Sequence, residues 1–455
     1  MHSITQTIAV ENEISSITES FFSAFKLGSL LKQSGAYKAK GIPVLGIFRQ
    51  LFELAFIHKK LFEALRAGGA VFAAKDTFYR FLNSVNINWT RFTLLLAERV
   101  VNGKLVPLTD EKRLNVFIVD DTVYERNRSK NVELLSWVYD HSRKVFVRGF
   151  RLLTLGWSDG NTFVPAGSCL LASADGDKRF QEARSVDKRS CGYRRRQLSQ
   201  GTAPVAMMEL VRGALAAGLK ASYVLFDSWF STPANILALK ELKLNVIAMV
   251  KKTSKVHYLY KGRMLPVTKI YAQEPKRRGR SRYLLSVEAE LQSLPVRLVF
   301  VRNRRKRKEY LVLLSTDRSL SEEEVVRLYG KRWSIEVFFK TCKSLLRLTR
   351  ECQSISYDAM SAWVSVVFAR YVMLAYLNRL DVDERTAGEL FYSVCDELAD
   401  ITLLEAFELL MRVWGEYVSE KLGLLEEDLS AMLEVFLTSP LVRSEERRVG
   451  KECRS

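Results

Sequence analysis

The chain has little of the residue types that build disulfide frameworks, zinc sites or histidine-based catalysis. Six cysteines and four histidines are spread over 455 residues, and no two cysteines form a C-x-x-C pair. This scatter argues against a zinc ribbon, a histidine metal site and a Ser-His-Asp triad. Chemistry in this protein must therefore rest mainly on carboxylates and on bases other than histidine.

The signals of export and of membrane insertion are also missing. The first residues, MHSITQTIAVENE, contain no basic region followed by an apolar core. The longest apolar stretch, Ala359 to Leu377, carries Arg370 at its middle, where a charge would be costly in lipid. We expect a buried helix there, no membrane partner, and a cytoplasmic protein with reduced cysteines.

The last thirteen residues, RSEERRVGKECRS at 443–455, have no apolar period. They resemble the translation of a sequencing adapter joined to a truncated gene, and we leave them out of fold reasoning. A natural basic tail is the alternative, because charged tails are common.

Positive charge is in excess and is clustered. The chain has 70 Lys and Arg against 51 Asp and Glu, a formal net charge of +19. Three basic clusters lie within residues 178–196, 276–282 and 302–308. One cluster alone would be read as a solvated surface, but three clusters and this net charge favour a polyphosphate partner such as nucleic acid. The block from Arg194 to Arg196 is a candidate DNA contact.

Length and composition indicate several folded regions. A chain of 455 residues with 48% hydrophobic residues predicts about three domains and excludes wholesale disorder. Residues 1–105 are predicted to be helical and to form a DNA-binding domain. There Asp76 can cap a helix that ends near Leu82, and a second helix runs from Trp89 to about Val101. This pair is as compatible with an ordinary helical hairpin as with a major-groove reader.

An α/β pattern follows over residues 106–250. Apolar runs predict strands at NVFIVDD, KVFVRGFRLLTLGWSDG, NTFVPAGSCLLAS and ASYVLFDSWF. A turn at Ser158-Asp159-Gly160 joins the second and third of these strands, and an amphipathic helix precedes the fourth. These elements predict an α/β core.

The second half of the chain alternates again between strands and helices. Residues 251–308 are predicted to form a basic, β-rich insertion with interleaved tyrosines. Residues 309–380 return to the core, with a buried strand and then one long helix that Ser319 or Ser321 caps. Residues 381–442 are predicted to be helical and to form a dimerisation region.

Three carboxylates stand at positions where they can converge. Asp121 and Asp227 end two buried strands, and Glu336 lies on the long helix after the last strand. Carboxylates at the ends of adjacent strands share one edge of an α/β sheet, where ligands bind. Such a group repels itself unless a cation joins it, and hard oxygen ligands suit Mg²⁺ or Mn²⁺. Two such ions about 4 Å apart can support phosphoryl transfer.

The long helix carries a polar stripe beside an apolar face. At 100° per residue, Tyr329, Arg332, Glu336, Lys340 and Lys343 share one side of the helix. A solvated face with a Glu336–Lys340 ion pair would give the same pattern. An arginine and two lysines around a metal-binding acid are also what a phosphodiester site needs.

Tyr329, Arg332, Glu336 and Lys343 reproduce the spacing Y-(2)-R-(3)-E-(6)-K. In this spacing the chain resembles the insertion sequence 4 family of bacterial DDE transposases. FIVDDT resembles the family's first-aspartate strand and VLFDSWFS its second, and the resemblance covers about residues 75–380. Three motifs in order are a far more specific signal than one.

The resemblance implies a ribonuclease H-like catalytic core with a β-rich insertion, flanked by N- and C-terminal helical regions. It implies that Asp121, Asp227 and Glu336 hold metal, and that Tyr329, Arg332 and Lys343 hold DNA phosphates, with Lys340 beside them. It also implies a cut-and-paste transposase that acts in the bacterial nucleoid. Such an enzyme hydrolyses double-stranded DNA at transposon ends as a homodimer, and the freed 3′-hydroxyl then attacks target DNA.

Two alternatives to this function stay open. One is a ribonuclease H-like nuclease without strand transfer, and the other is a catalytically inactive DNA-binding protein derived from a transposase. The choice of the first aspartate also has an alternative, because Asp120 adjoins Asp121 and successive strand residues face opposite ways. We select Asp121 because the family's aspartate precedes a small residue, here Thr122.

Overall fold

The computed structural model describes residues 15–56, 60–66, 73–109, 113–141, 143–278, 281–303 and 309–381. The expected regions 381–442 and 443–455 lie outside the described residues, except for Asp381. The fold combines helices with a large mixed β-sheet, so the α/β expectation is confirmed at that level.

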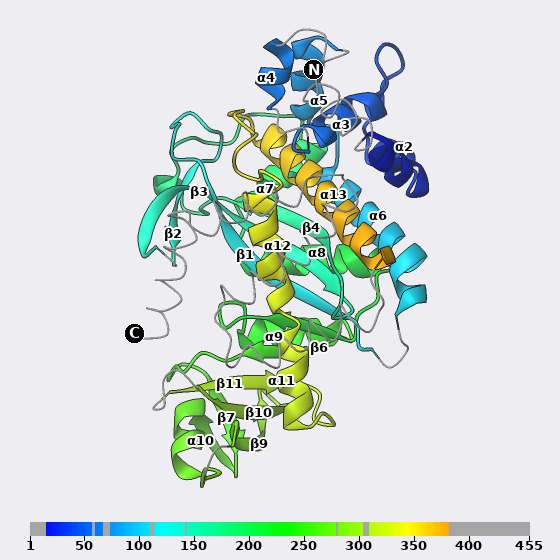
Figure 1. Cartoon of the computed structure of the whole chain (residues 1–455). Helices are drawn as coiled ribbons and strands as arrows, with labels where there is room; N and C mark the ends of the chain where they lie inside the picture. Colours follow the sequence, from blue (N-terminus) through cyan, green and yellow to red (C-terminus); the bar gives the residue numbers. More distant parts are fainter. Residues whose placement is uncertain are drawn as a thin grey trace, which may run out of the picture.

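One eleven-stranded sheet runs through the molecule in the order β2-β3-β1-β5-β6-β11-β10-β9-β7-β8, and β4 pairs with β3. The strands are β1 Val116–Glu125, β2 Ser136–Asp140, β3 Val145–Ser158, β4 Phe163–Leu171, β5 Tyr223–Phe226, β6 Asn245–Met249, β7 His257–Tyr260, β8 Arg263–Pro266, β9 Tyr283–Leu291, β10 Leu294–Arg302 and β11 Tyr310–Ser315. Strands β1, β5 and β6 are parallel, whereas β3 is antiparallel to β1 and β11 is antiparallel to β6. The strands expected as an insertion, β7 to β10, extend this same sheet at one end of the molecule (Figure 1).

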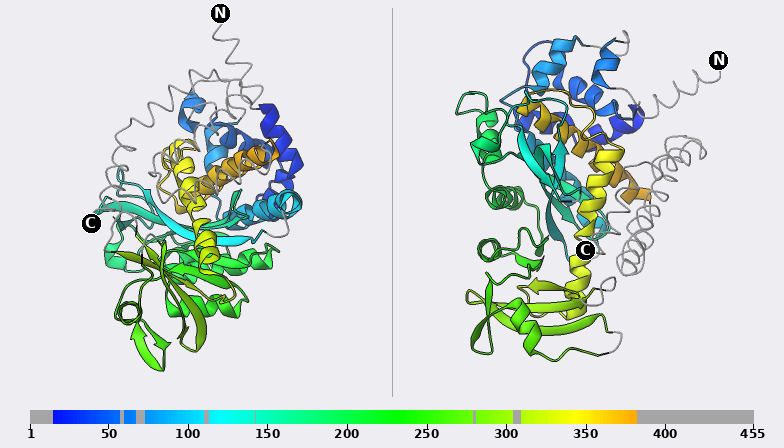
Figure 2. Two further views of the ribbon diagram at one scale, coloured as in Figure 1. Left: turned by 60° about the horizontal axis from the view of Figure 1, so that its bottom comes forward. Right: turned by 90° about the vertical axis from the view of Figure 1, so that its left-hand side faces the viewer.

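Helices cover both faces of the sheet. Figures 1 and 2 show α12 on one face and α8 and α9 on the other. The helices are α2 Leu27–Gln33, α3 Val44–Glu53, α4 Leu61–Arg66, α5 Lys75–Leu82, α6 Trp89–Val100, α7 Cys191–Ser199, α8 Ala203–Ala216, α9 Pro233–Glu241, α10 Val267–Gln273, α11 Glu322–Gly330, α12 Trp333–Ser344 and α13 Tyr357–Asp381. Residues 15–24 are also helical, and short π or 3-10 turns lie at Val101–Leu105, Val106–Leu108 and Gly176–Lys178.

Local sequence signals account for several element boundaries. Ser321 caps α11 in a reciprocal capping box with Glu324, which confirms one of the two expected caps. The expected turn between β3 and β4 is present, with Gly160 at φ +101° and the Asp159 carboxylate accepting two backbone N–H bonds. Asp76 lies within the first turn of α5, with no side-chain capping bond, so it is not the cap we expected.

The helix pair α5 and α6 belongs to the core. Trp89 and Phe92 of α6 are buried, and α6 packs on β4 and α13. Among the residues of α6, Arg91 alone is exposed. A helix enclosed in this way has little surface to offer a DNA groove, so the structure favours the ordinary helical pair over the major-groove reader.

The long apolar stretch is the core helix α13, as expected. By length and composition the stretch Tyr357–Arg379 could cross a membrane, but 72% of its apolar window is buried inside the protein. Arg370 is fully buried and is satisfied by protein groups. Its guanidinium donates to the backbone carbonyls of Leu51 and Phe52 and to the Glu351 carboxylate at 2.8 Å. This arginine therefore ties α13 to the N-terminal helices.

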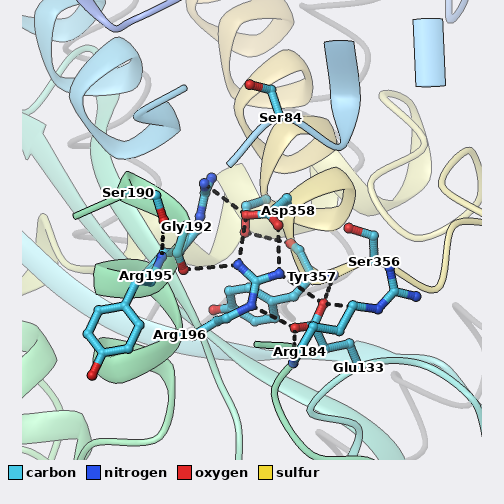
Figure 3. Close-up of polar contacts among 12 residues, drawn as sticks. Ser84, Glu133, Arg184, Ser190, Gly192, Arg195, Arg196, Ser356, Tyr357 and Asp358 are labelled. Atoms are coloured by element: carbon cyan, nitrogen blue, oxygen red, sulfur yellow. Dashed lines mark hydrogen bonds and ion pairs between the residues drawn. The ribbon is translucent and has the colours of Figure 1, made fainter. Parts of the chain in front are cut away.

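A second buried arginine joins three regions of the chain (Figure 3). Arg196 of α7 is 2% exposed and donates to the Glu133 carboxylate at 2.6 and 3.0 Å. It also donates to the Asp358 carboxylate, at the start of α13, at 3.1 and 2.6 Å. The neighbouring Arg195 shares Asp358 at 3.0 Å and donates to the carbonyl of Ile87. Arg195 and Arg196 are therefore structural residues, which corrects our expectation that this part of the block contacts DNA.

Glu133 carries much of this network. Burial alone would raise the pKa of the Glu133 carboxyl, but hydrogen bonds from Arg196 and from the backbone N–H groups of Arg184 and Tyr357 outweigh it. The pKa lies below its ordinary value of 4.5. A carboxylate whose pKa is lowered by folding stabilises the fold at pH values above its ordinary pKa. This stabilisation is lost as the pH falls through the folded pKa.

We predict that Glu133→Gln lowers the free energy of unfolding by about 3 kcal/mol or more at pH 7, because it leaves Arg196 with part of its buried charge uncompensated. Glu182→Gln, which alters an exposed ion pair with Arg179, is the control and should cost less than about 1 kcal/mol. Urea unfolding measures both variants. The gap between wild type and Glu133→Gln should close as the pH falls below 4.5. A gap that is small at pH 7 or constant with pH would contradict this account.

Candidate active site

The register of two parallel strands sets the first two acids of the site side by side. Val119 of β1 pairs with Phe226 of β5, so Asp120 and Asp227 are the next residues along each strand. Parallel strands end at one edge of the sheet, so side chains that follow paired residues meet there. The sheet itself therefore brings Asp120 to Asp227.

Helix α12 adds the third acid. Its apolar residues Ile335, Phe338 and Cys342 are fully buried, which confirms the expected apolar face and fixes the helix against the sheet. Glu336 then projects near Asp120. Burial raises the pKa of Asp120 to about 8; the Arg332 charge opposes the rise, and repulsion from Glu336, Asp227 and the adjacent Asp121 adds to it. The three carboxylates thus form one electrostatic group.

Asp121, which we expected at this site, has a different cation as its partner. Its side chain is 8% exposed and forms an ion pair with Arg151 of β3. Asp121 faces Leu153 across the β1–β3 ladder, and Arg151 stands two residues from Leu153, on the same face of the sheet. Adjacent strand residues point to opposite faces of a sheet, so only one of Asp120 and Asp121 can point toward Glu336. Asp120 shares Arg332 with Glu336, so Asp120 is our candidate for the first acid.

Arg332 supplies the positive charge of the group. Its guanidinium lies 2.8 Å from Asp120 Oδ2 and 2.5 Å from Glu336 Oε1, and it is 13% exposed. It also lies 5.7 Å from the centre of the Tyr329 ring. The two carboxylates raise the pKa of Arg332 further above its ordinary value and outweigh its burial. Arg332 is therefore held as a permanent cation between two acids that would otherwise repel each other.

A break in the expected long helix places Arg332. The structure has two helices, because α11 ends at Gly330 and α12 begins at Trp333. At the break Lys331 is 3% exposed, and its ammonium donates to the carbonyls of Leu114 and Asp159 at 2.7 and 3.1 Å. Burial lowers the pKa of Lys331 to about 8. The buried lysine anchors the turn, and the next residue is free to reach the carboxylates.

The other expected site residues differ in how closely they approach the acids. Tyr329 lies near the group: burial raises its pKa to about 12, and its hydroxyl has no hydrogen-bond partner among the described residues. Lys343 donates to the Thr122 hydroxyl at 2.7 Å, which sets it on the Asp120 face of β1. Lys340 is half-buried on α12. Glu336 forms an ion pair with Arg332, four residues before it on the helix.

The chemistry of the donor set fits a hard divalent cation. Asp120, Asp227 and Glu336 offer carboxylate oxygens from the middle of β1, the end of β5 and helix α12. Such oxygens are ligands of the kind that Mg²⁺ and Mn²⁺ take. Among the residues that the structure describes, no three His, Cys, Asp or Glu side chains are spaced to hold a metal ion as they stand. Arg332 explains this spacing, because its guanidinium lies between two of the three carboxylates.

Comparison with known proteins identifies a family for most of this region. The family model described as DDE superfamily endonuclease matches residues 64–308, which is more than half of the chain. The matched segment contains Asp120 and Asp227 and ends before Glu336. A search of curated proteins finds no match.

Proposed function

The chain belongs to the DDE superfamily endonucleases, and we propose that it is a transposase of the insertion sequence 4 type that cuts DNA at transposon ends. The observation that carries the proposal is the proximity of Asp120 to Asp227 and Glu336, with Arg332 bonded to Asp120 and Glu336. Family membership supports an enzyme that cleaves nucleic acid. The Y-(2)-R-(3)-E-(6)-K spacing, with its members near one another, supports the narrower reading.

In this proposal Asp120 takes the place that we had assigned to Asp121. Asp120, Asp227 and Glu336 hold Mg²⁺ or Mn²⁺, most simply as two ions. Two bound divalent ions supply activation of the attacking oxygen and stabilisation of the leaving oxygen. The mixed sheet around β1, β5 and β6 is then the ribonuclease H-like core that the resemblance implies.

Basic and phenolic side chains around the acids bind the DNA backbone. Arg332 would bind DNA when it is released from Asp120 and Glu336, because its planar guanidinium suits a phosphate oxygen pair. Lys343 and Lys340 add point charges on the same helix, and the unpartnered Tyr329 hydroxyl offers a further donor. These groups orient the scissile phosphate, and such positioning is a large part of catalysis in phosphoryl transfer.

The further steps follow from the resemblance. After hydrolysis the 3′-hydroxyl at the transposon end attacks target DNA in the same site, and two subunits pair two ends. A nuclease without strand transfer would share the carboxylate group and the cleavage step, so the products decide between the two. Joined transposon–target products support the transposase, and cut ends alone support the nuclease.

We predict that Asp120→Asn, Asp227→Asn and Glu336→Gln each lower metal-dependent cleavage by at least about 10²- to 10³-fold, the scale of losing one preorganised electrostatic contact. The assay is cleavage of labelled DNA that carries the sequence flanking the gene, with Mg²⁺ or Mn²⁺. DNA binding should stay within a few-fold of wild type.

Asp121→Asn is the control for this series, because Asp121 lies on the other face of β1. It should lower the melting temperature through the lost partner of Arg151, yet retain most cleavage per folded molecule. Loss of cleavage in Asp121→Asn with full activity in Asp120→Asn would reverse our assignment.

We also predict that Arg332→Gln makes the protein more dependent on divalent ions for stability. Without the guanidinium, Asp120 and Glu336 repel each other, so the melting temperature without metal should fall. Mg²⁺ or Mn²⁺ should then raise the melting temperature more in this variant than in wild type, because the ion no longer competes with an internal cation. Arg327→Gln, at an exposed position of α11, is the matched control. An equal response to metal in wild type and Arg332→Gln would show that Arg332 does not compete for the carboxylates.

A further inference from the structure

Lysines and aromatic rings alternate along a path that begins beside the acidic group. The backbone N–H of Trp229 donates to Asp227 Oδ1 at 2.8 Å, and the Trp229 side chain is 48% exposed. The Lys251 ammonium lies 4.7 Å from the centre of the Trp229 ring. The next residue, Lys252, lies 4.8 Å from the centre of the Tyr310 ring. Two adjacent lysines thus lead from Asp227 to the strands β7 to β11.

The path continues through two stacked tyrosines. The ring centres of Tyr310 and Tyr271 are 3.8 Å apart, and their planes differ by 20°. The Lys276 ammonium lies 4.6 Å from the centre of the Tyr271 ring. The result is a four-member ladder of lysine, tyrosine, tyrosine and lysine. We call the whole set the lysine–aromatic track, which consists of Trp229, Lys251, Lys252, Tyr310, Tyr271 and Lys276.

In this ladder the lysine ammonium groups remain available to a ligand, but the faces of the tyrosine rings do not. Each tyrosine has one face against the other ring, so the lysine over it occupies the second face. A nucleobase would need a vacant ring face to stack on. An ammonium has three donors, and a ring contact and one carbonyl use only part of this capacity. The track therefore suits backbone phosphates better than bases.

The lysines of the ladder are held in place before any ligand arrives. Lys252 donates to the Tyr310 carbonyl at 3.2 Å, and Lys276 donates to the Ala272 carbonyl at 3.4 Å. Lys252 is nevertheless exposed, and Lys276 is half-buried. A lysine whose side chain is already ordered loses less conformational entropy when it binds a phosphate. Cation–π contacts of this kind favour the lysine rotamers that the structure shows.

We propose that the lysine–aromatic track binds successive phosphates of the DNA strand that leads away from the cleavage site. The proposal rests on the proposed function, because it takes Asp227 as one end of the path. It assigns to the strands β7 to β10 and helix α10 the task of holding the DNA that flanks the scissile phosphate. An acidic protein segment would meet the same charges, and the experiment below separates the two partners.

The central test is DNA binding by the double variant Lys252→Gln/Lys276→Gln of the full chain. The matched control is Lys255→Gln/Lys269→Gln, which removes two exposed lysines outside the track. The probe is a labelled duplex of about 30 base pairs, or three helical turns, measured by fluorescence anisotropy over a range of salt concentrations. Each phosphate contact contributes about 0.9 to the slope of log affinity against log salt. The track variant should lose about 1.8 from this slope and bind at least tenfold more weakly at low salt.

The slope of the control pair should fall by less than half as much as the slope of the track variant. Equal slopes in the two double variants would overturn the proposal, because the track would then be ordinary surface charge. Poly-glutamate is the second probe. If the track variant loses affinity for poly-glutamate as strongly as for DNA, and the control does not, the surface binds acidic protein and the proposal is wrong.

The rings provide an independent test with the lysines unchanged. Tyr271→Phe/Tyr310→Phe keeps the stacked rings and should bind DNA like wild type. Tyr271→Leu/Tyr310→Leu removes the rings that both ammonium groups contact. The DNA affinity of this variant should approach that of the lysine variant, and its melting temperature checks that it is folded. Equal affinity in the phenylalanine and leucine pairs would overturn the role of the rings.

Cleavage separates failure of the track from failure of the proposed function. If wild type cuts DNA with Mg²⁺ and the track variant shows a raised KM with an unchanged kcat, both proposals stand. If wild type cuts DNA and the track variant matches the control pair in KM, the track fails alone. If wild type does not cut DNA at all, the proposed function fails, and the salt slopes still report on the track.

Discussion

Repulsion between buried carboxylates, and its compensation by one guanidinium, is the interaction on which the candidate site depends. Asp120 lies close enough to Asp227 and Glu336 for both to raise its pKa, and Arg332 is bonded to Asp120 and Glu336 together. Without a cation such a group would push apart the strand ends and the helix that carry it. Arg332 offsets this repulsion in the structure, and we propose that divalent ions do so during the reaction.

Strands and helices of the fold hold the three acids and Arg332 in position. The β1–β5 register aligns the first two acids, and the buried face of α12 fixes the third. Lys331 anchors the break between α11 and α12, so that Arg332 stands at the start of α12 and reaches back to β1. Far from the acids, Arg196 and Arg370 lock α13 to the rest of the chain. The site is thus placed by buried polar contacts as much as by apolar packing.

Much of this could be predicted from the sequence, because it depends on local patterns. Apolar runs indicated β1, β3, β4, β5 and β11, Ser321 signalled the start of α11, and the spacing of Tyr329, Arg332 and Glu336 indicated a shared surface. The mid-stretch Arg370 also argued correctly for a buried helix.

What could not be predicted depends on tertiary contacts. Our preference for Asp120 over Asp121 rests on the contacts of Arg332 and Arg151, which a single sequence does not show. At the helix break, Lys331 donates to the carbonyls of Leu114 and Asp159, on two segments that are remote from it in sequence. Arg195 and Arg196 read as surface charge because their partners, Glu133 and Asp358, are remote in sequence.

The most direct test of the central claim is anomalous diffraction from crystals of the full chain soaked in Mn²⁺. The account predicts a manganese peak bounded by the carboxylates of Asp120, Asp227 and Glu336, with the Arg332 guanidinium turned away from them. A site left without manganese, or a peak bounded by Asp121 with Asp120 still paired to Arg332, would contradict it.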